Sequence, residues 1–264
     1  MDLVNHAMSV GYSGRRDDII HAFKAGSDLH GARIEGKSDL DVAGVFIEAP
    51  VLNLGIDKRE HFITSTADNG VKNTTDDKDA AFHSLRHWAC LAAGGNPTII
   101  AYAFAPIDSQ LADSVWAQDV VPNVEHFIAK KHTNAFLGYA INQLKRLQGK
   151  LGAGKHGQRP ELEALYGYDT KMAMHMIRLL QEGIELMKTG RLTFPRPEKD
   201  LLLQIRKGEW TLERVEQYFA ELDAELRATE LASPLPKNID RAKVSSIISN
   251  AYLSHWRSQG LLPF

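Results

Sequence analysis

The chain has 264 residues, of which 44% are hydrophobic and 24% charged, and this composition is typical of a globular protein with one large or two modest domains. Its formal net charge of −2 argues against bulk electrostatic capture of nucleic acid, and its single cysteine excludes an intramolecular disulfide or a cysteine-based zinc site. The N-terminal residues lack a signal-peptide pattern and no apolar run reaches the roughly 18 residues of a membrane span, so we expect a cytoplasmic protein.

The first third of the chain has strand patterns. Residues 19–23 form a β-branched and aromatic run that predicts a strand ending before a Gly-Ser pair. Residues 29–36 indicate a turn or a single helical turn between glycines. Residues 39–47 alternate between apolar and other side chains and predict a second strand, and residues 60–65 predict a third. Residues 67–78 are polar and indicate a loop.

From Asp79 onward the apolar residues recur every three or four positions, which predicts helices. The first predicted helix ends at Gly94-Gly95, and a basic, glycine-rich loop is expected at 149–160. The other predicted helices are 97–104, 121–148, 169–189, 212–226 and 240–256. We therefore expect an α+β fold, with a small β-containing domain at 1–106 and an all-helical domain at 107–264.

Two acids stand in the second predicted strand. Asp39 and Asp41 alternate with Leu40 and Val42, so their carboxylates share one face of the strand. Like charges this close repel unless something positive lies between them, and a carboxylate-only site suits Mg²⁺ together with substrate phosphates. Two solvated acids on a strand are the alternative interpretation, but aspartate is depleted in strands.

The Gly26-Ser27 pair precedes these acids. A glycine at the end of a strand lets a phosphate approach the backbone, and the hydroxyl of Ser27 can donate to a phosphate oxygen. Together, Gly26-Ser27 and Lys37-Ser38-Asp39-Leu40-Asp41 resemble the signature of the DNA polymerase β-type nucleotidyltransferases. Within that superfamily the chain is most similar to the RNA-ligase-associated predicted nucleotidyltransferases of bacteria and their phages. The similarity continues, more weakly, through Asp79, Ser84-Leu85-Arg86, Gly95-Asn96-Pro97, Gln143-Leu144-Lys145, Thr170-Lys171 and His175 to Leu179.

The resemblance implies a small mixed nucleotidyltransferase β-sheet with flanking helices, followed by a helical bundle. It also implies that Asp39 and Asp41 bind divalent metals and that Gly26, Ser27 and Ser38 contact the triphosphate. Two-metal phosphoryl transfer calls for a third carboxylate. Asp79 is favoured because it precedes the Ser84-Leu85-Arg86 segment, and Asp77 is the reserve. Relatives often carry an acid shortly after Asn-Pro, where this chain has Ala101.

Basic side chains should meet the triphosphate. Lys171, His175 and Arg178 are spaced by four and three residues, so they share one face of a predicted helix. Lys37 and Lys145 are further candidates, and a solvated surface position is an equal alternative for each.

These features predict a Mg²⁺-dependent nucleotidyltransferase that uses two metal ions, with Mn²⁺ as a possible substitute. It would transfer a nucleoside monophosphate from ATP or another nucleoside triphosphate to a hydroxyl, with an RNA end as the leading acceptor. An inactive nucleotide sensor on the same fold, and an enzyme that nucleotidylates a protein or a small molecule, are the alternatives. The sequence leaves the preferred base and the oligomeric state open.

Overall fold

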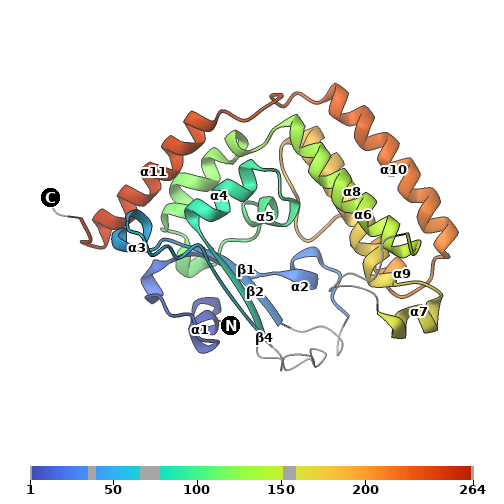
Figure 1. The fold of residues 1–264 in the computed structure, drawn as a ribbon, viewed down its shortest axis with the longest axis horizontal. Helices are drawn as coiled ribbons and strands as arrows, with labels where there is room; N and C mark the ends of the chain where they lie inside the picture. The colour runs from blue at the N-terminus through green and yellow to red at the C-terminus, as the bar shows by residue number, and fades with distance from the viewer. Residues whose placement is uncertain (1, 35–39, 66–77, 151–158, 263–264) are drawn as a thin grey trace.

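A computed structural model describes residues 2–34, 40–65, 78–150 and 159–262 (Figure 1). It confirms the predicted α+β class: a four-stranded mixed sheet is flanked by helices, and the rest of the chain is helical. The sheet has the order β1-β2-β4-β3, in which β2 and β4 are parallel and the outer pairs antiparallel. The strands are β1 Ile19–Lys24, β2 Leu40–Phe46, β3 His61–Ser65 and β4 Lys78–Ser84.

The helices lie on both faces of the sheet. α1 packs on one face, and α4 and α5 cover the other, where the C-terminal helices also gather (Figure 1). The α-helices are α1 Leu3–Ser9, α2 Gly26–His30, α3 Pro50–Leu54, α4 Leu85–Ala93, α5 Pro97–Tyr102, α6 Thr133–Leu147, α7 Pro160–Tyr166, α8 Thr170–Thr189, α9 Lys199–Arg206, α10 Leu212–Ala232 and α11 Arg241–Ser258. Five short 3-10 or π segments complete the described helical structure: Arg16–Asp18, Ser109–Leu111, Trp116–Val120, Val121–Phe127 and Lys130–His132.

The structure corrects the prediction of a helix from Asp79 onward. Residues Lys78–Ser84 form strand β4, and helix α4 begins only at Leu85, where the Ser84 hydroxyl accepts a hydrogen bond from the backbone N–H of His87 at 3.2 Å. β4 fills the space between β2 and β3, so both of its edges are paired and Phe82 is fully buried. Pairing on both edges outweighs the weak strand propensity of its alanines.

The predicted helix at 121–148 is also shorter than expected. Its first part is a 3-10 segment, and α6 starts at Thr133. Between them, the backbone N–H groups of Lys130 and Lys131 donate to the carbonyl oxygens of Pro236 and Lys237, at 2.9 and 3.3 Å. Backbone donors that bond to another segment cannot serve a continuous helix, so the helix is interrupted here.

The pleat of β2 directs its side chains into two cores. Val42 and Phe46 face the smaller core, which includes residues of α1, whereas Ala43 and Val45 face the larger core beneath the helices. The larger core contains residues from both sides of the predicted boundary at residue 106, and that boundary remains a prediction. In the described ranges, no helix combines the length and the apolar character that a membrane span requires.

One buried histidine in this core has a testable electrostatic consequence. His21 of β1 is fully buried, stacks on Trp116 with ring centroids 4.7 Å apart, and donates from Nε2 to the carbonyl oxygen of Tyr102 at 3.1 Å. Burial lowers the pKa of His21 to about 3. The fold therefore holds this imidazole in its neutral form.

We expect the free energy of unfolding to fall as the pH drops below about 6.5, because the unfolded chain then protonates His21 and the folded chain does not. The contribution of His21 is about 1.4 kcal/mol per pH unit between pH 6 and pH 4. Urea denaturation at several pH values measures the slope, and His21→Met should reduce it by that amount. Equal slopes in the two proteins would contradict a neutral, buried His21.

Candidate active site

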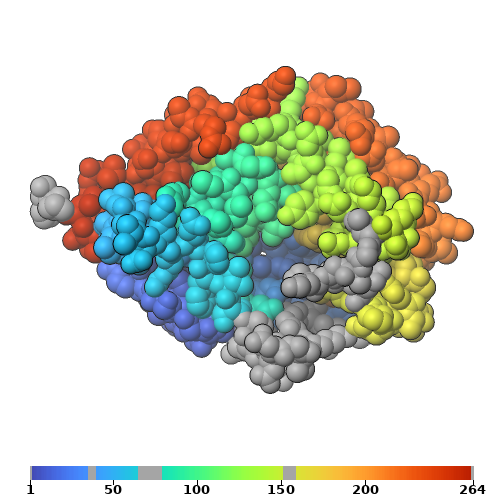
Figure 2. Space-filling view, viewed as in Figure 1, coloured from blue at the N-terminus to red at the C-terminus, as the bar shows by residue number. Residues whose placement is uncertain are grey.

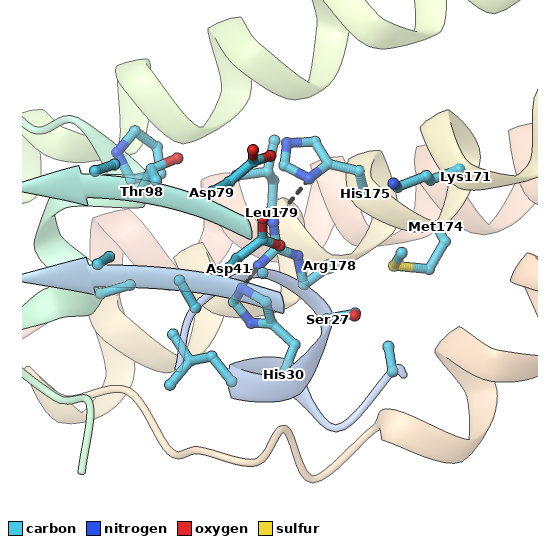
Figure 3. A pocket seen from close by; sticks show the side chains of 18 of the residues that line it. Ser27, His30, Asp41, Asp79, Thr98, Lys171, Met174, His175, Arg178 and Leu179 are labelled. Carbon is cyan, nitrogen blue, oxygen red and sulfur yellow. Dashed lines mark hydrogen bonds between the residues drawn. The ribbon is translucent and has the colours of Figure 1, made fainter. Parts of the chain in front are cut away.

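The floor of the site is a pair of aspartates on neighbouring parallel strands. Asp41 of β2 is in register with Asp79 of β4, and adjacent strands lie about 4.8 Å apart. Both side chains point to the helical side of the sheet, because Asp41 alternates in phase with Ala43 and Asp79 in phase with Ala81 (Figure 3). The structure therefore brings together two carboxylates that the sequence separates widely, and oxygen ligands so arranged suit a hard divalent cation.

Gly26 allows the first turn of α2 to approach Asp41 closely. Its φ angle is +55°, a conformation that residues with a side chain adopt at a cost, and a Cβ atom at this position would collide with Oδ2 of Asp41. The neighbouring backbone N–H of Ala25 donates to the carbonyl oxygen of Asp41 at 2.8 Å. Ser27 lines the same cavity (Figure 3). The Gly-Ser pair thus forms the first turn of a short helix beside the acids.

A basic face of α8 lies opposite the acids. Lys171, His175 and Arg178 all line the cavity, as their spacing predicts, and Figure 3 shows His175 and Arg178 beside Asp41 and Asp79. Arg178 donates from Nη2 to Nδ1 of His175 at 2.7 Å. Burial, reinforced by the positive charge of Arg178, lowers the pKa of His175 to about 3. His175 is therefore neutral at physiological pH, and its proton is on Nε2.

The cavity between the sheet and these helices has a volume of about 900 Å³. Figure 2 shows the hollow near the middle of the face, with N-terminal residues in blue at its floor. Four residues of α5 and Gln143 of α6 also line the cavity, and Arg159 and Arg206 add positive charge to its lining. This volume falls within the range of pockets that bind molecules of nucleotide size.

Not every predicted site residue reaches this cavity. Lys145 is exposed on α6 and is not among the lining residues; Gln143 of the same helix lines the cavity instead. Ala101, which stands where relatives often carry an acid, also lines it. The remaining predicted residues lie outside the described residues: Lys37, Ser38, Asp39 and the alternative third acid Asp77. Asp79 is thus the candidate third acid that the structure places beside Asp41.

Two functional candidates were missed by the sequence analysis. His30 of α2 and Glu182 of α8 both line the cavity, and both contact Arg178. A signal for Glu182 existed, because it follows Arg178 by four residues and lies between the apolar residues Leu179, Leu180 and Ile184 of α8. His30 offered none, since its burial depends on the docking of α2 against α8.

The donor set of the floor fits a hard metal ion in chemical type. Both described acids offer carboxylate oxygens, and the missing Cβ of Gly26 lets the Asp41 carboxylate lie against the first turn of α2. Within residues 2–34, 40–65, 78–150 and 159–262, no group of three or more histidine, cysteine or acidic side chains is arranged to hold a metal. The predicted third oxygen ligand, Asp39, lies outside those ranges.

The family comparison matches residues 4–247 of the chain to the model of the RNA repair pathway DNA polymerase beta family. Comparisons with curated proteins and with solved structures gave no significant match. The matched segment includes β1 to β4, the acids of the floor and the whole of α8. Because the match spans well over half of the sequence, the chain belongs to the RNA repair pathway DNA polymerase beta family.

Proposed function

We propose that the protein is a metal-dependent nucleotidyltransferase that transfers a nucleoside monophosphate from a nucleoside triphosphate to the hydroxyl of an RNA end. The observation that carries this proposal is the in-register pair Asp41 and Asp79, which faces the basic residues of α8 across one cavity. The membership of a polymerase β family named for RNA repair supports the reaction class and the acceptor. We place the protein in the cytoplasm, as the single cysteine suggests.

Asp41, Asp79 and Asp39 would hold the metal, which we take to be two Mg²⁺ ions that Mn²⁺ can replace. When bound, the metal would lower the pKa of the attacking hydroxyl and neutralise charge on the phosphates. The acids of this chain then serve as oxygen ligands. The acids lie near the start of two paired strands, and this pairing keeps their carboxylates in register while substrates bind and leave.

The remaining residues bind and orient the triphosphate. The first turn of α2 offers backbone N–H groups and the Ser27 hydroxyl to phosphate oxygens. Lys171 and Arg178 neutralise the charge that accumulates on the leaving pyrophosphate, and neutral His175 donates a hydrogen bond from Nε2. Arg159 and Arg206 would meet the phosphates of an RNA acceptor. In this scheme the protein mainly positions the substrates and offsets their charge.

The proposal is tested with the four α-labelled nucleoside triphosphates, Mg²⁺ or Mn²⁺, and short RNAs with defined ends. The expected result is pyrophosphate release with transfer of the label to RNA. Transfer of the label to protein or to a small molecule would show that the acceptor is not the RNA end that we propose. Nucleotide binding without pyrophosphate release under any condition would indicate a sensor and overturn the catalytic assignment.

A further inference from the structure

A carboxylate lies buried in the middle of α8. Glu182 is only 2% exposed, and its helical neighbours Leu179, Leu180 and Ile184 are buried apolar residues. An ionised carboxylate in such a place is costly unless it is paired and hydrogen-bonded. Its presence in the wall of the nucleotide cavity therefore calls for partners that offset the cost.

Two basic side chains surround this carboxylate. Oε1 of Glu182 lies 3.4 Å from Nη1 of Arg178, one turn earlier on α8, and 3.2 Å from Nδ1 of His30 on α2. Nη1 of Arg178 also contacts Nε2 of His30. Glu182, Arg178 and His30 thus form a closed triangle that joins the two helices, and we call it the Glu182 triad.

The protonation states of the triad follow from these contacts. Nε2 of His30 faces a guanidinium, which can only donate, so Nε2 is the acceptor and Nδ1, 3.2 Å from Oε1 of Glu182, carries the proton. Burial and the charge of Arg178 lower the pKa of His30. Burial raises the pKa of Glu182, but Arg178 and His30 outweigh that effect and bring the pKa to about 2. The triad therefore contains one cation, one anion and one neutral imidazole.

The triad fixes the direction of the Arg178 guanidinium. Nη1 is held by Glu182 and His30, and Nη2 donates to Nδ1 of His175 at 2.7 Å, so the Nη groups are oriented from two sides. His30 belongs to the same short helix as Gly26 and Ser27. The triad consequently connects the phosphate-binding turn of α2 to the basic face of α8.

We propose that Glu182 is a positioning residue of the nucleotide site: it orients Arg178 and His30 so that α2 and α8 present their donors to one triphosphate. This inference rests on the proposed function. Glu182 itself is not expected to touch the nucleotide, because its carboxylate is directed at two basic side chains. Its effect on binding should pass through Arg178.

The same helix supplies a matched control. Glu185 pairs with the fully buried Arg196 and accepts a hydrogen bond from the Thr193 hydroxyl at 2.6 Å. Glu185 thus connects α8 to the segment around residue 195, just as Glu182 connects α8 to α2. Neither Glu185 nor Arg196 lines the cavity. The backbone N–H of Arg196 also donates to the carbonyl oxygen of His30 at 3.2 Å, so a variant of Glu185 reports the cost of losing an ion pair of α8 that adjoins the triad without contacting Arg178.

The experiment measures, by calorimetry in the presence of Mg²⁺, the binding of the α,β-methylene analogues of ATP, GTP, CTP and UTP. The proteins compared are the wild type, Glu182→Gln, Glu185→Gln, Arg178→Gln and the double variant Glu182→Gln/Arg178→Gln. We expect Glu182→Gln to raise the Kd of the bound analogue about tenfold, as loss of a supporting partner typically does. Glu185→Gln should leave that Kd unchanged. In the Arg178→Gln background, Glu182→Gln should have no further effect.

Each outcome supports or overturns a named statement. An unchanged Kd in Glu182→Gln, or an equal loss in Glu185→Gln, would overturn the positioning role while leaving the proposed function intact. A tenfold loss that persists in the Arg178→Gln background would show that Glu182 does not act through Arg178. Absence of binding by the wild type would instead overturn the proposed function. If thermal melting shows that Glu182→Gln does not fold, Glu182→Met/Arg178→Met removes both charges at similar volume, and its Kd should equal that of Arg178→Gln.

Discussion

Asp41→Asn is expected to reduce the rate of pyrophosphate release by about 10³-fold, and Asp79→Asn should have a similar effect. An amide is a weaker ligand for a hard cation than a carboxylate, and the pair lies in register at the cavity floor, so either change replaces one of the two described carboxylates with a neutral amide. The rate is measured with a saturating triphosphate and Mg²⁺. Asp113→Asn, which changes an exposed acid outside the cavity lining, should keep the wild-type rate.

The melting temperature separates a lost ligand from a lost fold. Like charges that face each other on adjacent strands destabilise a sheet, so Asp41→Asn should not melt earlier than the wild type when Mg²⁺ is absent. The wild type should melt at a higher temperature as Mg²⁺ is added, because a ligand that binds the native state stabilises it. Asp41→Asn should lose most of this increase. A full Mg²⁺ response together with full activity in both variants would refute the metal role of the pair.

Gly26→Ala is expected to reduce activity by about 100-fold, because a Cβ atom there collides with Oδ2 of Asp41 and displaces the carboxylate. The substitution also places a side chain at φ +55°, which costs roughly 1–2 kcal/mol of stability. The measurements are the rate of pyrophosphate release and the free energy of unfolding in urea.

Gly167→Ala separates these two effects. Gly167 also has a positive φ angle, +82°, but a Cβ atom there would meet no atom within 4 Å. It should therefore lose roughly 1–2 kcal/mol of stability while keeping its activity. Similar activities for Gly26→Ala and Gly167→Ala would show that the close approach of Gly26 to Asp41 is not needed for the reaction.

Local patterns in the sequence were sufficient to predict much of the site. The Gly-Ser pair identified the turn beside the acids, and helical spacing placed Lys171, His175 and Arg178 on one face of α8, where all three line the cavity. Strand alternation predicted the orientation of Asp41. These features depend on the neighbouring residues alone, since side-chain direction follows directly from the local backbone conformation.

The features that sequence reasoning missed depend on contacts between distant segments. β4 is a strand because β2 and β3 offer it two edges, whereas its own residues also fit a helical period. The exposure of Lys145 corresponds to the surface alternative that the sequence left open, and the packing of α6 against α8 decides between the two. Glu182 is buried because His30 and Arg178 meet it from two helices, and a charged residue in a helix is otherwise expected at the surface.

The strand order has a consequence for how the protein folds. β4 follows β3 in the chain yet lies between β2 and β3 in the sheet, so the two acids become neighbours only when β4 pairs with β2, and β3 joins the sheet through β4. An intermediate in which β1 is paired with β2 and β3 with β4, but β2 is not yet paired with β4, would hold both acids on separate hairpins. The cation site that we propose would therefore be assembled by the β2–β4 pairing itself and not by either hairpin alone.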